Sequence, residues 1–156
     1  MKNFILTLIA ACLFMSCGQT KKSTEQQENS KLIALSFDDG PNTTTTVKML
    51  DMLEKHGVVA SFFVNGNKIN DTTAVVMKRT LDMGCDIQNH SQTHPSMPKL
   101  TAEQIREEVV QTSDLIDKYV GVRPTFFRPP FIVVNQTMYE NIELPFICGA
   151  GCDDWV

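Results

Sequence analysis

Short apolar runs alternate with segments of helical periodicity along most of this sequence. The runs at 32–37 and 58–64 are apolar and rich in β-branched or aromatic residues, as buried strands are. Between them, residues 43–56 place their apolar side chains on one helical face. Strands that alternate with helices at this spacing form a parallel sheet joined by right-handed crossovers. The sequence therefore predicts an α/β fold.

We expect the same alternation to continue along the chain. The stretch Thr101-Ala-Glu-Gln104 has the pattern of a capping box, and Gly121 marks the end of the helix that follows it. The further helices are expected over 71–83, 101–120 and 135–141, and the further strands over 85–88, 124–127 and 145–150.

Chemically active residues follow directly after three of the expected strands. Asp38 and Asp39 follow the first strand, His90 and His94 the third, and Arg128 the fourth. Because the carboxyl ends of parallel strands meet at one rim, we expect these side chains to lie near one another. The chemistry of the protein is therefore expected at this rim.

Two adjacent carboxylates are costly to keep together. Asp38 and Asp39 repel one another, so their pairing indicates a bound cation or a proton-transfer task. Asp-Gly-Pro is also ordinary turn chemistry, which is the alternative interpretation.

The two histidines are four residues apart. At this spacing one helical turn presents both imidazoles on one face, as a chelating pair requires, and Pro95 then opens the turn into a loop. Two imidazoles and a carboxylate leave a coordination position open, as in catalytic zinc sites. The alternative is a pair of structural histidines.

Two further segments suit the same rim. Arg128 is a fixed cation that can pair with a carboxylate, and because Pro129 and Pro130 lack an amide hydrogen, Phe131 supplies the next free backbone donor. Asp154 and Trp155 offer a carboxylate and an aromatic wall suited to a sugar ring. A surface arginine and a frayed chain end are the alternatives.

The first thirty residues have the features of an export signal and a tether. The apolar run from Phe4 to Met15 is too short to span a bilayer, and the Ser-Cys-Gly around Cys17 resembles a bacterial lipoprotein signal. We expect a signal peptide over 1–16, a lipidated polar tether over 17–30 and one domain over 31–156. Lipidation at Cys12 and a signal cleaved without lipidation are the alternatives.

The net charge argues against a nucleic-acid partner. Removing residues 1–16 takes away one of the 14 basic residues and none of the 18 acidic ones, so the net charge falls from −4 to −5. Three cysteines remain in the domain, Cys85, Cys148 and Cys152. This odd count allows one bridge or three buried thiols.

The order of these motifs carries a family resemblance. The stretches "SFDDGP", "HSQTH", "FRPPF" and "DDW", with "ASFFVNG" after the first helix, resemble the polysaccharide deacetylase family, carbohydrate esterase family 4. The resemblance covers residues 31–155. It implies a distorted, incomplete (β/α) barrel of parallel strands with outer helices, and metal-dependent removal of acetyl groups from N- or O-acetylated carbohydrate.

The resemblance also assigns roles to the motif residues. It implies that Asp38 is the catalytic base and that Asp39, His90 and His94 bind the metal. The remaining roles are an arginine that orients the base (Arg128), an oxyanion-binding amide (Phe131), substrate contacts (Pro130 and Trp155) and a carboxylate that orients a later histidine (Asp154).

The expected metal and partners follow from the same resemblance. Zinc is expected, with cobalt, nickel or manganese also compatible with such ligands. An acetylated glycan such as chitin, peptidoglycan or acetylxylan is the expected substrate. The separate resemblance of the N-terminus to a lipoprotein signal implies a lipid anchor that would hold the protein at the membrane of a bacterial cell envelope, facing the periplasm or the surface.

One part of the family pattern is missing from the sequence. The family's later Leu-x-His motif has no match, Ile132 replaces a usual glycine, and Gly151 stands where an aspartate is frequent. We therefore expect a truncated chain that lacks its last strands. The alternative to an active deacetylase is a metal- and carbohydrate-binding remnant without turnover. A phosphatase is disfavoured, because no basic residues mark a phosphate site.

Overall fold

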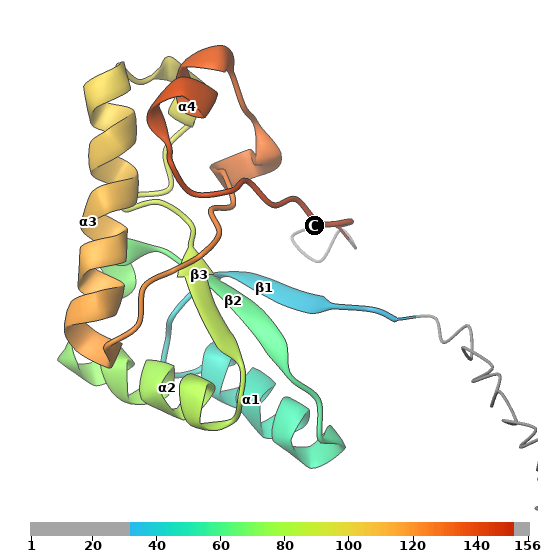
Figure 1. Ribbon diagram of the computed structural model, residues 1–156. Helices are drawn as coiled ribbons and strands as arrows, with labels where there is room; N and C mark the ends of the chain where they lie inside the picture. Colours follow the sequence, from blue (N-terminus) through green and yellow to red (C-terminus); the bar gives the residue numbers. More distant parts are fainter. Residues whose placement is uncertain (1–31, 152–156) are drawn as a thin grey trace, which may run out of the picture. The chain divides into compact units, whose positions relative to one another are not determined.

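Three parallel strands form the sheet in the computed structural model, which describes residues 32–151 (Figure 1). They are β1 (Leu35–Gly40), β2 (Ala60–Val64) and β3 (Asp86–Asn89), hydrogen-bonded in that order. The crossovers contain α1 (Thr45–His56) and α2 (Asp71–Asp82). The α/β class with parallel strands, predicted from the alternation of elements, is confirmed.

Two more α-helices follow the third strand. Figure 1 shows α1 and α2 together under the strands, α3 (Ala102–Val120) along the side of the sheet, and α4 (Gln136–Asn141) near one end of α3. Short 3₁₀ turns are η1 (Gly66–Lys68), η2 (Met97–Lys99) and η3 (Pro130–Ile132). Within residues 32–151, no helix combines the length and the apolar character needed to cross a membrane.

Local sequence signals define where the helices begin and end. Thr101 accepts a hydrogen bond from the Gln104 N–H, and the Gln104 side chain accepts one from the Thr101 N–H, so the predicted capping box is present. Gly57 and Gly121 end α1 and α3 in the left-handed conformation, with φ of 62° and 72°. This conformation favours glycine because it has no Cβ.

The predictions of fourth and fifth strands were wrong. Within the described residues these segments contribute only isolated parallel bridges, Asn89 with Phe127 and Phe127 with Phe146. Prolines without an amide hydrogen flank both segments, at 124, 129, 130 and 145, and this prevents a longer ladder. The two bridges nevertheless continue the order of the sheet beyond β3.

The first strand is less buried than its apolar sequence indicates. Among the described residues β1 pairs with β2 alone, and Leu35 is 41% exposed. The strand expected over 58–64 is shorter, because Val58 and Val59 precede β2 and are 40% and 57% exposed. Its second half is buried on both faces as expected, since Phe62, Phe63 and Val64 are each at most 5% exposed.

The apolar core has two parts. One is formed by side chains of the sheet, α1 and α2, and includes Leu50, Phe62, Met77 and Ile87. The other lies between α3, α4 and the segment after it, and includes Ile105, Phe127 and Met138.

Several predicted features lie outside the described residues. They are the signal, the tether with Cys17, and the segment with Cys152, Asp154 and Trp155. Within the described part, Cys85 is buried, Cys148 is exposed, and both are free thiols.

Candidate metal centre

Three potential metal ligands converge at the carboxyl ends of β1 and β3. One donor atom each from Asp39, His90 and His94 lies within 4.8 Å of the others. The Asp39 Oδ1 atom is 3.4 Å from His94 Nε2 and 3.8 Å from His90 Nε2. The structure therefore brings together the two motifs that the sequence placed at one rim.

The donor set fits a divalent transition metal. Nitrogen and oxygen ligands around one tetrahedral zinc ion lie about 3.3 to 3.6 Å apart, given bond lengths of about 2.0–2.2 Å. The Asp39–His94 distance falls in this range, and the Asp39–His90 distance exceeds it by a few tenths of an ångström. Imidazole with carboxylate is a ligand mixture that zinc, cobalt, nickel and manganese accept.

His90 is held in the tautomer that a metal ligand needs. Its Nδ1 lies 2.7 Å from the Arg128 carbonyl oxygen, and since a carbonyl can only accept, Nδ1 carries the hydrogen and the Nε2 lone pair faces Asp39. Burial lowers the pKa of His90, against the opposing effects of Asp38, the bond to Arg128 and Asp39. The buried imidazole is therefore kept neutral near pH 7.

Asp39 is oriented by residues that follow β2. The Asn65 side-chain amide donates to Asp39 Oδ1 over 3.1 Å, and Lys68 Nζ donates to the Asp39 carbonyl oxygen over 2.7 Å. Asp39 has a left-handed φ of 65°, and the register of the strand is irregular between Phe37 and Gly40. This backbone turn directs two consecutive carboxylates to the same rim.

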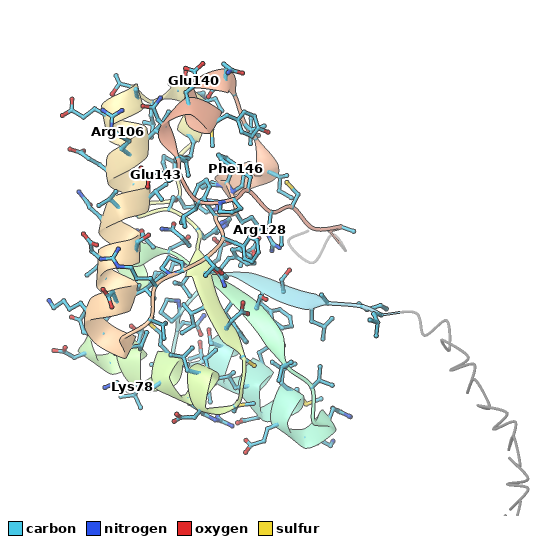
Figure 2. The ribbon with its side chains drawn as sticks, viewed as in Figure 1. Lys78, Arg106, Arg128, Glu140, Glu143 and Phe146 are labelled. Atoms are coloured by element: carbon cyan, nitrogen blue, oxygen red, sulfur yellow. The ribbon has the colours of Figure 1, made fainter. Side chains whose placement is uncertain are left out.

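Asp38 is paired with a buried arginine. Arg128 Nη1 lies 2.6 Å from Asp38 Oδ1 and 3.0 Å from Ser36 Oγ, and the guanidinium stacks 3.9 Å from the centre of the Phe63 ring. Figure 2 labels Arg128 near the ends of the strands, and its two hydrogen bonds join it to residues of β1. The second Asp38 oxygen, Oδ2, is 3.9 Å from His90 Nε2, beside the three ligand atoms.

The segment after Arg128 borders the same centre. Phe131 has a φ of 59°, is 65% exposed, and packs its ring edge-on against His94 with the centroids 4.7 Å apart. In the described part of the chain the Phe131 N–H has no hydrogen-bond acceptor. Pro130 is less than 2% exposed, so the expected substrate contact of Pro130 is not supported, and its ring instead packs inside the protein.

A cleft of about 790 Å³ opens beside the two aspartates. It is lined by residues of β1, by Arg128 and Ile132, and by the segment 149–151. The space next to Asp38 and Asp39 is therefore accessible to a molecule from solution.

The expected helical turn between the histidines is absent. Ser91 and His94 have left-handed φ values of 71° and 57°, and residues 90–94 form an irregular loop. Spacing alone predicted the correct pair of imidazoles but the wrong backbone, because the left-handed Ser91 and His94 interrupt the expected helical turn.

Sequence reasoning missed four residues that orient the charged groups. Asn65 binds Asp39, Ser36 and Phe63 contact Arg128, and Glu108 binds the loop between the histidines. Asn65 follows β2 at the same rim, so its position was a usable signal. Nothing local marks Glu108, which lies in the middle of a helix.

Comparison with known proteins identifies close relatives of this chain. Residues 25–144 match the family model described as polysaccharide deacetylase. The bifunctional xylanase/deacetylase of Pseudobutyrivibrio xylanivorans is 46% identical over 148 residues, which are 95% of this chain and 24% of that protein. The peptidoglycan-N-acetylglucosamine deacetylase PgdA of Listeria monocytogenes is 36% identical over 129 residues, which are 82% of this chain and 28% of that protein.

A solved structure shares the fold. The family 4 acetyl xylan esterase from Clostridium thermocellum, in complex with a cobalt ion, has a TM-score of 0.79 and 40% sequence identity, and the match covers 81% of this chain and 62% of that one. By comparison, the match covers about a quarter of the length of each of the two curated relatives, the Pseudobutyrivibrio and Listeria proteins.

Proposed function

The chain belongs to the polysaccharide deacetylase family, and on that premise we propose that it hydrolyses acetyl groups on a carbohydrate polymer with the help of a divalent metal ion. The observation that carries this proposal is the convergence of Asp39, His90 and His94 beside the Asp38–Arg128 pair. Acetylxylan, peptidoglycan and chitin-like polymers are the proposed substrate classes, and the names of the related acetyl xylan esterase and peptidoglycan deacetylase support the first two.

Asp39, His90 and His94 would hold the metal, and zinc is the proposed ion. When bound, such an ion polarises an acetyl carbonyl and lowers the pKa of water. The cobalt ion in the related esterase supports a site for a divalent transition metal in this family.

Asp38 is the proposed general base. Its Oδ1 is bound by Arg128, so Oδ2 is the oxygen free to accept a proton from the attacking water. The Arg128 bond fixes the direction of the carboxylate, and Ser36 and Phe63 fix the direction of the guanidinium.

Phe131 is the proposed donor to the developing oxyanion. Its N–H has no acceptor among residues 32–151, and its ring contacts His94. A backbone donor held at that edge can stabilise negative charge on the acetyl oxygen. By resemblance, Trp155 would contact the sugar, and Asp154 would orient the family's later histidine, the proton donor to the leaving group, which has no match in residues 1–156.

Acetate release from the full chain tests this function. Because residues 1–156 contain no match to the family's proton-donating histidine, wild type should bind metal but release acetate only slowly, and more from acetate esters, as in acetylxylan, than from the amides of chitin oligomers and peptidoglycan. This activity should be lost on chelation and regained with zinc or cobalt. Asp38→Asn should bind metal and release at least about 100-fold less acetate, because an amide cannot accept the proton. Activity that survives both chelation and Asp38→Asn would contradict the proposal.

We also propose that Cys17 is lipidated and that the polar tether holds the domain at a membrane of the bacterial envelope. The apolar run followed by Ser16-Cys17-Gly18 supports this location. In cells, Cys17→Ser should move the protein from the membrane fraction to the soluble fraction or block its processing, whereas Cys12→Ser should not. Unchanged partitioning of Cys17→Ser would contradict lipidation at that residue.

A further inference from the structure

The loop that carries the two histidines has an unusual backbone. Ser91 and His94 both adopt left-handed φ values, 71° and 57°, which side chains other than glycine rarely occupy. Such conformations persist only where the surrounding structure enforces them. The groups that hold this loop therefore decide where the His94 imidazole lies.

One carboxylate on α3 binds the middle of the loop. Glu108 Oε2 accepts from the backbone N–H groups of Gln92 and Thr93, each over 2.8 Å, and Glu108 Oε1 accepts from Thr93 Oγ1 over 2.7 Å. These three bonds to a charged acceptor are short and directional. They connect a half-buried helix residue to the segment between the two proposed ligands.

The ends of the loop are bound by a second, buried set of contacts. Asn89 Oδ1 accepts from the Ser91 N–H over 2.8 Å, and Ser91 Oγ accepts from the His94 N–H over 3.1 Å. The Asn89 amide in turn donates to the Val109 carbonyl and to Ser113 Oγ. Asn89 thus ties the beginning of the loop to the same helix, directly after Glu108.

We propose that Glu108 is a positioning residue for the metal centre. It makes no hydrogen bond to a ligand atom, but its three bonds hold the 91–93 backbone in the path that brings His94 Nε2 to within 3.4 Å of Asp39 Oδ1. Loss of the carboxylate leaves two backbone donors without this acceptor and frees the loop to relax away from its left-handed conformation. The inference rests on the proposed metal site and deepens it.

Two substitutions at this position separate hydrogen bonding from charge. In Glu108→Ala all three bonds are lost. In Glu108→Gln the amide oxygen can still accept from both N–H groups, and the amide nitrogen can donate to Thr93 Oγ1, so the loop should keep its path. Thr93→Ala removes only one of the bonds and serves as a milder variant.

Two further variants are matched controls. Glu107→Ala removes the neighbouring, exposed carboxylate of the same helix. Ile116→Val destabilises α3 at a buried position of the core without touching the loop, and so reports what a loss of stability alone does to metal binding.

The measurements are calorimetric zinc titration and hydrogen exchange of the Gln92 and Thr93 amides in the metal-free protein. Glu108→Ala should weaken zinc binding about 10- to 100-fold, the usual effect of losing an outer partner of a ligand, and should speed exchange of both amides. Thr93→Ala should weaken zinc binding by about threefold. Glu108→Gln, Glu107→Ala and Ile116→Val should stay within about threefold of wild type.

Each outcome decides the inference. Wild-type zinc affinity and wild-type exchange in Glu108→Ala would overturn the role of Glu108 and leave the proposed function standing. A loss in Glu108→Gln equal to that in Glu108→Ala would overturn the hydrogen-bond account. A wild type that binds no zinc would overturn both the metal site and the positioning role.

Discussion

At the scale of single residues, Asp38 and Asp39 are neighbours in sequence with different partners. Asp38 pairs with Arg128, whereas Asp39 faces the two histidines and accepts a bond from Asn65. The left-handed φ of Asp39 makes this division possible, because a regular strand would send consecutive side chains to opposite faces.

The two carboxylates should therefore respond differently to substitution. Asp39→Ala should weaken zinc binding by more than the roughly 10- to 100-fold expected for an outer partner, because it removes one of three ligands. Asp38→Asn should change zinc affinity by less than about tenfold while abolishing turnover. Calorimetric titration of both variants checks this, and loss of metal in Asp38→Asn with retention in Asp39→Ala would reverse the two roles.

Ile132 also has a left-handed backbone conformation, which β-branched residues rarely adopt. It has a φ of 55° and is 47% exposed. A β-branched residue in this region is strained by about 1–2 kcal/mol relative to its usual conformations, and its exposed side chain contributes little burial in return.

Replacing Ile132 by glycine should stabilise the protein. Ile132→Gly should raise the free energy of unfolding by about 1 kcal/mol, because glycine adopts a positive φ without strain. Val133→Gly is the control, since Val133 is equally exposed but has a φ of −103° and should lose about 0.5 to 1 kcal/mol. Urea unfolding measures both; destabilisation by Ile132→Gly would show that its side chain stabilises more than its backbone costs.

At the scale of elements, α3 connects the outer scaffold to the metal centre. Its N-terminus is closed by the Thr101–Gln104 capping box, its buried stripe includes Ile105, Val109 and Ile116, and its middle turns carry Glu108 and the partners of Asn89. Arg106 of α3 also donates a hydrogen bond to Asn141 of α4. Stability of this helix therefore supports the loop that carries His90 and His94.

The cap of α3 should contribute measurably to stability. Thr101→Ala should lower the free energy of unfolding by about 1 kcal/mol, because the Gln104 N–H loses its side-chain acceptor. Thr101→Ser keeps a hydroxyl and should stay within about 0.5 kcal/mol of wild type. Chemical denaturation compares the three proteins. If the alanine variant is as stable as wild type, water replaces Thr101 as the hydrogen-bond acceptor of the Gln104 N–H.

At the scale of the whole folded part, the apolar core consists of two separate clusters. The cluster around the sheet contains Phe62 and Ile87, and the second cluster contains Phe127 and Met138. Phe127 belongs to the second cluster and also bridges to β3 through Asn89. Packing in the second cluster therefore fixes the segment that leads directly into Arg128.

Core packing should be separable from metal binding. Met138→Ala should lower the free energy of unfolding by about 2–5 kcal/mol, because Met138 is fully buried. Met52→Ala, at a half-exposed position of α1, should stay within about 0.5 kcal/mol. Under conditions where both variants are folded, zinc affinity should match wild type; a large loss of affinity in Met138→Ala would show that the second cluster positions the ligands as well.

Features that depend on neighbouring residues could be predicted from the amino-acid sequence. The alternation of strands and helices, the Thr101 cap, the glycine at the end of α3 and the presence of carboxylates and imidazoles at strand ends all follow from local pattern. These features are encoded within a few residues of where they act, so periodicity and turn chemistry are sufficient to predict them.

Which groups meet, and in what orientation, could not be predicted in this way, because it depends on how distant segments pack. Arg128 reaches Asp38 across 90 residues of sequence, and Asn65 reaches Asp39 across 26. Glu108 bends the 91–93 loop into a path that its own sequence does not favour, so the expected helical turn does not form. Pro130 is buried rather than exposed to substrate. Each of these results depends on contacts between distant segments, whose energies decide among local conformations that the sequence pattern leaves open.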